Sequence, residues 1–242
     1  MNYFILNDIR SCDYGIIMTQ PPKAVIPERL VDTIAVPGRS GALIMDSKSY
    51  ANVQMSYQCA ILPEDDSSLR AAVEAAMPLL MPTAEYKRLE CTYYPDSYRM
   101  ARVSNKISIE SIVEEAGKFE IPFDFKPQRY LKSGEHPILL SGDCILWNPT
   151  NFPALPLITV YGSGAGELIV GDIVVQIKAN DGHIVLDSEM QDAYRVADSG
   201  ALENKNGSIY APDFPHLPAG ETAISWMGDI TRIEIIPRWW TL

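Results

Sequence analysis

The sequence predicts a mainly β protein with one α-helix and a break between an N-terminal and a C-terminal domain. Apolar and polar residues alternate with a period of two along several segments, as in strands that bury one face. One segment, residues 69–80, instead repeats its apolar residues at helical spacing. The chain of 242 residues, 47% hydrophobic and 21% charged, is long enough for one large β domain or two ordinary domains.

The strand pattern of the N-terminal part is clearest at residues 53–61 and recurs at 107–110 and 119–126. Strands of this kind are typical of antiparallel sheets with one wet face. Pro122 lies inside the last segment and has no N–H to donate. We therefore expect an edge strand or a bulge at Pro122.

The helix predicted over residues 69–80 has a single apolar stripe, which is enough to pack it on a sheet. The stripe consists of Leu69, Ala72, Val73, Ala76, Met77 and Leu80. Residues 65–68 supply two aspartates and two serines, which suit a helix N-terminus as charges and caps. Pro78 and Pro82 are expected to end the helix.

Two segments of the N-terminal part read as turns. Residues 94–98, Tyr-Pro-Asp-Ser-Tyr, predict a hairpin turn. In the second, Pro37 presets one dihedral angle, Gly38 and Gly41 allow positive φ, and the tight loop presents Arg39. The Arg39 guanidinium suits a carboxylate on a neighbouring subunit, although a plain solvent-exposed hairpin loop explains the same residues.

The domain boundary is expected at residues 128–137, which are polar, contain Gly and Pro, and break the alternation. It separates a domain of residues 1–130 from a domain of residues 137–242. The second domain contains short strand-like segments at 157–161, 167–170, 173–178, 183–187, 222–226 and 230–236. Residues 180–182 and the glycine-rich residues 162–166 read as turns between them, and the spacing predicts an all-β sandwich.

The sequence contains no readable catalytic or metal centre, and we expect no enzymatic activity, no metal and no cofactor. The four cysteines, Cys12, Cys59, Cys91 and Cys144, are far apart and read as small buried hydrophobes. His136, His183 and His216 are isolated as well. Residues 162–166 lack the lysine of a phosphate-binding loop. Asp187 and Glu189 would share one face of a strand, but catalysis needs a second acid placed by the fold.

Charge and hydropathy exclude further classes. The net charge of −11 and the absence of a basic patch disfavour stable binding to nucleic acid. No apolar run is long enough for a membrane span, and the N-terminus lacks the features of a signal peptide, so we expect synthesis in a cytoplasm and no membrane partner.

The tryptophans are candidate contact residues. Trp239 and Trp240 adjoin near a strand end, so one of them should point outward and mark a contact in an oligomer or between domains. All four tryptophans, Trp147, Trp226, Trp239 and Trp240, could also stack on sugar rings, although core or interface packing is the commoner role of tryptophan.

The order of several short segments resembles the distal tail proteins of long-tailed bacteriophages and their prophage counterparts. The segments are residues 14–16, 36–41, 94–98, 119–127, 151–156, 184–189, 214–220 and 233–239. They are short, so the specificity of the resemblance lies in their order and spacing, which extend over almost the whole chain.

The resemblance implies an N-terminal β-sandwich-like domain with one helix and a C-terminal galectin-like β-sandwich. It implies a structural hub at the virion tail tip, made in the bacterial host cytoplasm, in which six N-terminal domains close into a ring. One face of that ring would dock on the tail tube protein and the other on a tail-associated fibre or lysin-like protein. The hole of the ring would pass DNA without binding it. A carbohydrate-binding module is the alternative function, and a hydrolase built on Asp187 and Glu189 is the third.

Overall fold

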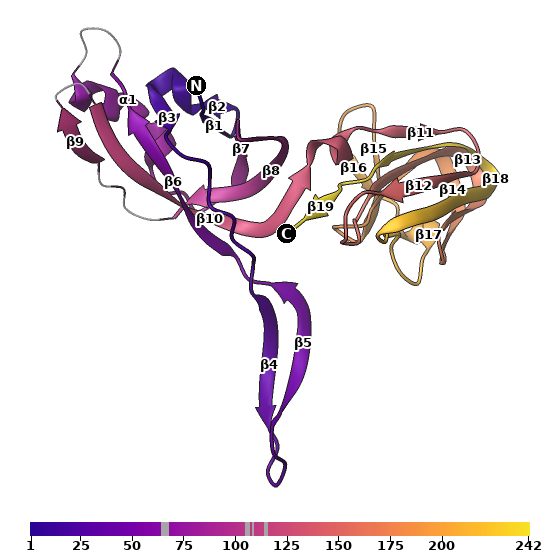
Figure 1. The fold of residues 1–242 in the computed structure, drawn as a ribbon. Helices are drawn as coiled ribbons and strands as arrows, with labels where there is room; N and C mark the ends of the chain where they lie inside the picture. Colours follow the sequence, from indigo (N-terminus) through magenta and orange to yellow (C-terminus); the bar gives the residue numbers. More distant parts are fainter. Residues whose placement is uncertain (64–67, 105–106, 108, 114–115) are drawn as a thin grey trace. The chain divides into compact units, whose positions relative to one another are not determined.

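The computed structural model describes residues 1–63, 68–104, 107, 109–113 and 116–242 (Figure 1). The chain divides into two compact units, Met1–Arg129 together with Leu242, and Tyr130–Thr241. Strands dominate both units, and α1 (Leu69–Leu80) is the only α-helix in the described ranges. The predicted mainly β class with one helix is therefore confirmed.

The first unit begins with short strands, continues with a long hairpin and α1, and ends in long antiparallel strands. Its elements besides α1 are β1 (Phe4–Leu6), β2 (Ile9–Arg10), the 3-10 helix η1 (Ser11–Tyr14), β3 (Ile16–Met18), β4 (Arg29–Ala35), β5 (Ala42–Tyr50), β6 (Val53–Ile61), β7 (Lys87–Cys91), β8 (Tyr94–Val103), β9 (Ile109–Val113) and β10 (Ala116–Leu131).

Most of these strands form one antiparallel sheet with the order β2-β1-β7-β8-β10-β6-β3, and β9 also pairs with β10. The alternation at residues 53–61 and 119–125 places Tyr57, Phe123 and Phe125 on the buried face, where their rings meet at tilted or edge-on angles. Phe4 from β1 closes the cluster. The period-two pattern therefore specifies an aromatic core, as expected of a half-buried sheet.

Pro122 does not lie at an edge or a bulge, so that prediction is wrong. Strand β10 lies between β8 and β6, and its register with β6 runs unbroken through the pair Pro122–Ser56. The carbonyl of Pro122 faces the other neighbour and accepts from the N–H of Ser104, just past the end of β8. In an antiparallel strand the N–H and C=O of one residue point to the same side, so the missing donor falls where β8 has already ended.

Helix α1 begins as predicted, because the Ser68 hydroxyl caps it by accepting from the N–H of Ala71. Asp65, Asp66 and Ser67 lie outside the described residues. Pro78 does not end the helix, which continues to Leu80. Two further corrections concern the stripe: Leu79 is buried, whereas Met77 is 46% exposed. A proline within the last turn removes only one hydrogen bond, and the helix packs through Ala76, Leu79 and Leu80.

The predicted turn at residues 94–98 is also corrected. The chain turns at residues 92–93, and β8 already begins at Tyr94, opposite Cys91. The next paired residues are Glu90 and Tyr98, so Pro95, Asp96 and Ser97 form a bulge inside β8. Proline has no N–H for the ladder, and a bulge is one of the few places within a sheet that tolerate it.

The second unit is built on three long strands. Its elements are η2 (Lys132–Glu135), β11 (Ile138–Leu140), β12 (Cys144–Asn148), β13 (Leu157–Val170), β14 (Ile173–Asp187), β15 (Asp192–Val196), β16 (Leu202–Asn204), η3 (Asn206–Ser208), β17 (Ile209–Tyr210), β18 (Gly220–Ile236) and β19 (Trp240–Thr241). The sheet order is β11-β18-β13-β14-β15-β16, with β12 on β18 and β17 on β14.

Each of the long strands β13, β14 and β18 joins two of the short strands that the sequence predicted. Residues 162–166 and 180–182 are therefore not turns but lie inside β13 and β14. The register shifts at these positions, and side chains from both halves of the strands meet in one core that includes Ile158, Leu168 and Ile184. The bend lets one continuous ladder cover both sides of a core, which is how the sandwich arises.

Glycine makes this bend possible. A Cβ on Gly162 would lie 2.2 Å from the carbonyl oxygen of Asp229, and a Cβ on Gly228 would lie 2.5 Å from that of Ala165. Gly228 also has φ +80°. Close approach of two backbones and left-handed φ are the two conditions that favour glycine within a strand.

Residues 128–137, where the domain boundary is expected, consist mostly of regular secondary structure. Strand β10 continues to Leu131, and η2 follows directly. Within the second unit, the N–H of Leu131 donates to the carbonyl of Trp239 and the N–H of Arg238 to that of buried Gly134. No helix in the described part of the chain is long and apolar enough to cross a membrane.

Candidate interaction surfaces

The hairpin of β4 and β5 is the most exposed element of the first unit. The two strands pair from Arg29–Tyr50 to Ala35–Ala42, and in the described chain they pair with no other strand. Figure 1 shows them as a separate two-stranded ribbon. Both faces of this ribbon carry exposed apolar side chains, namely Leu30, Val31, Ile34, Leu43, Ile44 and Met45. An isolated ribbon of this kind is marginal in water, so its apolar surface indicates a contact with another protein.

The base of the hairpin is fixed by polar contacts. The guanidinium of Arg29 binds both carboxylate oxygens of Asp46 and donates from Nη1 to the hydroxyl of Tyr50 at 3.1 Å. The N–H of Lys48 also donates to Asp46. The hydrogen bonds from Arg29 and Lys48 lower the pKa of the Asp46 carboxyl to about 2. These contacts join the two strands at the base of the ribbon, where the register shifts between Leu30 and Val31, but they lie in solvent and contribute little to stability.

The loop at the tip of the hairpin contains the predicted interface residues. Pro37, Gly38, Arg39 and Gly41 are all exposed. Gly38 and Gly41 have φ +80° and +85°, and the N–H of Arg39 donates to the carbonyl of Val36 at 3.1 Å. The tight turn thus presents the Arg39 side chain to solvent, and its role at a subunit interface stays a prediction.

The two adjacent tryptophans lie within the second unit. Trp239 is 4% exposed and belongs to the core. Trp240 is partly buried, stacks on Phe152 with 4.7 Å between ring centroids, and donates from Nε1 to the carbonyl of Pro153. Both rings therefore have partners inside their own unit, and a contact of either ring with another protein stays a prediction.

Asp187 and Glu189 do not form a paired acid site. The Asp187 carboxylate is held by Arg238, whose Nη1 and Nη2 lie 2.7 and 3.1 Å from its two oxygens. Burial alone would raise the pKa of Asp187, but the hydrogen bonds from Arg238 and from the N–H groups of Met190 and Glu189 outweigh it and hold that pKa below its usual value. Glu189 lies beyond the strand, 3.5 Å from the same arginine. The arrangement is that of a structural clamp.

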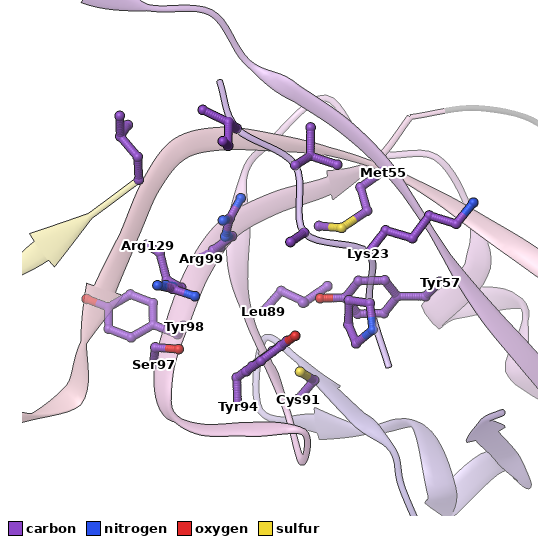
Figure 2. A pocket seen from close by; sticks show the side chains of 15 residues that line it. Lys23, Met55, Tyr57, Leu89, Cys91, Tyr94, Ser97, Tyr98, Arg99 and Arg129 are labelled. Carbon is purple, nitrogen blue, oxygen red and sulfur yellow. The ribbon is translucent and has the colours of Figure 1, made fainter. Parts of the chain in front are cut away.

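A cavity of about 250 Å³ lies in the first unit, beside strands β7, β8 and β10 (Figure 2). The segment from Pro22 to Ile26 forms one wall. Tyr57, Leu89 and Cys91 line the cavity from the neighbouring strands, Tyr94 comes from the start of β8, and Ser97 comes from its bulge. The position of the bulge depends on where β8 begins, and the sequence did not predict that start correctly. The cavity therefore could not be predicted from the sequence.

Arg99 and Arg129 are the charged residues of this cavity that the sequence analysis missed. They come from neighbouring strands β8 and β10, and Figure 2 shows their side chains on the same wall, with Lys23 directed away from them. The alternation of apolar and polar residues along β10 could have predicted one of them. Arg129 lies four residues after buried Phe125, so it falls on the same, inward face of the strand.

The comparisons with known proteins agree with these features. Residues 7–125 match the family model described as phage tail protein RIFT-related domain. The fold is similar to the crystal structure of SPP1 Dit (gp 19.1), described as a paradigm of the hub adsorption apparatus in phages that infect Gram-positive bacteria; the TM-score is 0.75, the identity 13%, and all of both chains is covered. A search of curated proteins finds no match. The resemblance to distal tail proteins of long-tailed phages is thereby confirmed.

Proposed function

We propose that this chain, whose residues 7–125 match the family model described as phage tail protein RIFT-related domain, is a structural hub protein of a phage tail tip. The observation that carries the proposal is the similarity in fold over the full length of both chains to SPP1 Dit. The similarity therefore extends through both units and is not confined to the first.

In this function the first unit closes into a ring, which we propose to be hexameric. A closed ring of identical subunits needs two different surfaces on each subunit, one for each neighbour. The exposed apolar hairpin of β4 and β5 supplies one such surface, and its tip presents Arg39 to a carboxylate of the next subunit. This proposal assigns residues 1–130 to the ring and residues 137–242 to a galectin-like sandwich outside it.

The ring would join the tail tube protein to a tail-associated fibre or lysin-like protein and leave a channel for DNA. Electrostatics supports passage without retention, because the chain has 20 basic against 31 acidic residues. A wall with many unpaired lysines and arginines would bind phosphates strongly at low salt. A gel-shift assay at low ionic strength should therefore show no stable complex with DNA; tight binding there would argue against this channel.

The central test is the mass of the full chain in solution. Light scattering at rising protein concentration should show assembly toward a closed species, and negative-stain images should show rings. The matched variants Arg39→Ala at the hairpin tip and Arg70→Ala on the solvent face of α1 separate an interface effect from a general loss of charge. A monomer at every concentration, with no rings in the images, would overturn the ring.

As a structural hub, the chain would have no enzymatic activity. The acids with the clearest geometry are engaged in structural contacts, Asp187 with Arg238 and Asp124 with Arg102 and Tyr86. Glycan hydrolysis that is abolished by Asp187→Asn, in a variant that remains folded, would contradict this assignment.

Carbohydrate binding by the second unit is the second candidate, and Trp147 is the observation that favours it. Its side chain is 62% exposed on β12, next to Ile145 on the same face of the strand. An exposed indole offers a flat apolar surface for a sugar ring. Glycan-array binding that Trp147→Ala removes would support this function, and a blank array would leave the hub as the sole proposal.

A further inference from the structure

We propose that the cavity beside β7, β8 and β10 is a binding site for a carboxylate carried by a small aliphatic group, with Arg99 and Arg129 as the residues that bind the charge. The inference concerns this cavity alone and does not depend on whether the chain forms a ring.

Neither arginine forms an ion pair within the described residues. No side chain that lines the cavity in the described part of the chain is a carboxylate, and the main-chain carboxylate of Leu242, which also lines it, forms no ion pair with either arginine. Nη1 of Arg99 and Nε of Arg129 are buried and have no hydrogen-bond partner there. Two unpaired cations are unexpected in a chain with 11 more acidic than basic residues, which could readily supply a partner.

Without an anion, this arrangement of two buried guanidinium groups is energetically unfavourable. Burial lowers the pKa of Arg99, and the neighbouring positive charge of Arg129 lowers it further. The ring of Phe125 lies near Arg99, with 5.8 Å from the guanidinium carbon to the ring centroid, which is a weak substitute for a counter-ion. An anion between the two guanidinium groups would remove both penalties at once, because it pairs the buried donors and screens the like charges.

The lining of the cavity favours a carboxylate on an apolar body over other anions. A planar carboxylate matches the two parallel donors of a guanidinium group. The other walls of the cavity are largely apolar and include Met55, Tyr57 and Leu89. A cavity of about 250 Å³ admits a short aliphatic body beside the carboxylate. A bare phosphate would leave the apolar walls uncovered, so a small organic acid fits the lining better.

This chemistry has two sources: a free acid, and the carboxylate of a segment of another protein. The rim of the cavity is compatible with the second source, since Val25 and Ile26 are 38% and 87% exposed and would contact such a segment.

The test uses N-acetyl-leucine as the probe and titration calorimetry on the full chain. N-acetyl-leucinamide, which has the same body without the charge, and inorganic phosphate, which has charge without the body, are the controls. We expect saturable binding of the acid, at least about tenfold weaker binding of both controls, and a similar loss in Arg99→Gln and in Arg129→Gln. Arg70→Gln, an exposed arginine on α1, should bind like the parent.

Equal binding of the acid and the amide, or an unchanged affinity in both cavity variants, would overturn the proposal. So would the absence of acid binding, as for a cavity already filled from within the chain, for example by Leu242, which also lines it. The cavity variants should melt no lower than the parent, because they remove unpaired buried charges. A clearly lower melting temperature would assign the arginines a structural role instead.

Native mass spectrometry separates the two sources. A small acid that is retained by the purified parent and lost in the Arg99→Gln variant identifies a free ligand. A parent that carries no such mass but binds N-acetyl-leucine identifies a site open to a protein carboxylate.

Discussion

At the scale of single residues, the charge of the buried Asp187 carboxylate is stabilised by the arginine that faces it. Asp187 ends a strand, and Arg238 comes from the chain after β18, 51 positions later. The side chain of Asp187 is only 5% exposed, so its charge depends on that one arginine and two backbone N–H groups. A buried carboxylate with this set of donors is stabilised as the anion.

Removal of this charge should destabilise the second unit. We expect Asp187→Asn to lower the free energy of unfolding by about 2 kcal/mol or more, because the partly buried guanidinium of Arg238 then keeps only the exposed Glu189 carboxylate, 3.5 Å away, of its two anionic neighbours. Urea denaturation of the full chain measures the loss. Asp213→Asn, at an exposed loop position, is the control and should unfold like the parent.

The same contact predicts a pH dependence. The folded pKa of Asp187 is lower than its unfolded value of about 3.9, so its contribution is complete above that value and disappears as the pH falls through the folded pKa. Between pH 6 and pH 3 the parent should therefore lose more stability than Asp187→Asn. Equal losses in the two proteins would show that the Arg238 contact is not the source.

Arg39 provides the residue-scale test of the interface. Since the exposed loop makes few contacts of its own, Arg39→Ala should leave the unfolding free energy within about 0.5 kcal/mol of the parent. The concentration at which the chain assembles should rise about tenfold, as for the loss of one charge-assisted contact. Sedimentation of Arg39→Ala and Arg70→Ala side by side measures this; similar assembly by both would remove Arg39 from the interface.

At the scale of elements, the hairpin of β4 and β5 presents an uncovered apolar surface. Ile44 is 67% exposed on β5. Its replacement by serine should change the stability of the monomer little, because little apolar surface is buried there, but it should weaken assembly. Met190→Ser, at an equally exposed apolar position of the second unit, is the control for assembly measured by light scattering.

The glycine-bearing bends of the second unit give a second element-scale prediction. Gly228→Ala should destabilise that unit by about 2 kcal/mol or more, because the new Cβ meets the carbonyl of Ala165 and φ is positive. Gly142→Ala has open space around its new Cβ and should be close to neutral. Thermal unfolding of both variants measures the difference, and equal melting temperatures would show that the bend tolerates a side chain.

At the scale of the whole molecule, the buried residues form two separate clusters, one in each unit. We therefore expect calorimetry to resolve two unfolding transitions. Ile61→Ala, in the first core, should lower the free energy of unfolding of the first unit by about 3 kcal/mol and leave the transition of the second unit in place. Ile184→Ala, in the second core, should have the same effect on the second unit and leave the first in place. A single transition that both variants shift would show that the units unfold together.

How far the sequence predicts this molecule varies from element to element. The helix and a serine cap at residue 67 or 68 were predicted because capping and amphipathic spacing are local properties, and the structure shows that Ser68 is the cap. The turn at residues 94–98 and the position of Pro122 were predicted wrongly. The outcome at both depended on where the neighbouring strand begins or ends, and no local pattern contains that information.

The sequence by itself determined the mainly β class, the single helix and the tight loop that presents Arg39, because these depend on residues close together in the chain. It also determined the resemblance to distal tail proteins, which lies in the order and spacing of short segments along the chain. Only the tertiary structure decided that pairs of short strands fuse into long bent ones, that Asp187 faces Arg238, and that Arg99 and Arg129 share one cavity wall. The physical reason is the same in each case: strand pairing joins residues that are distant in sequence, and burial then sets the electrostatic environment of the charges it brings together.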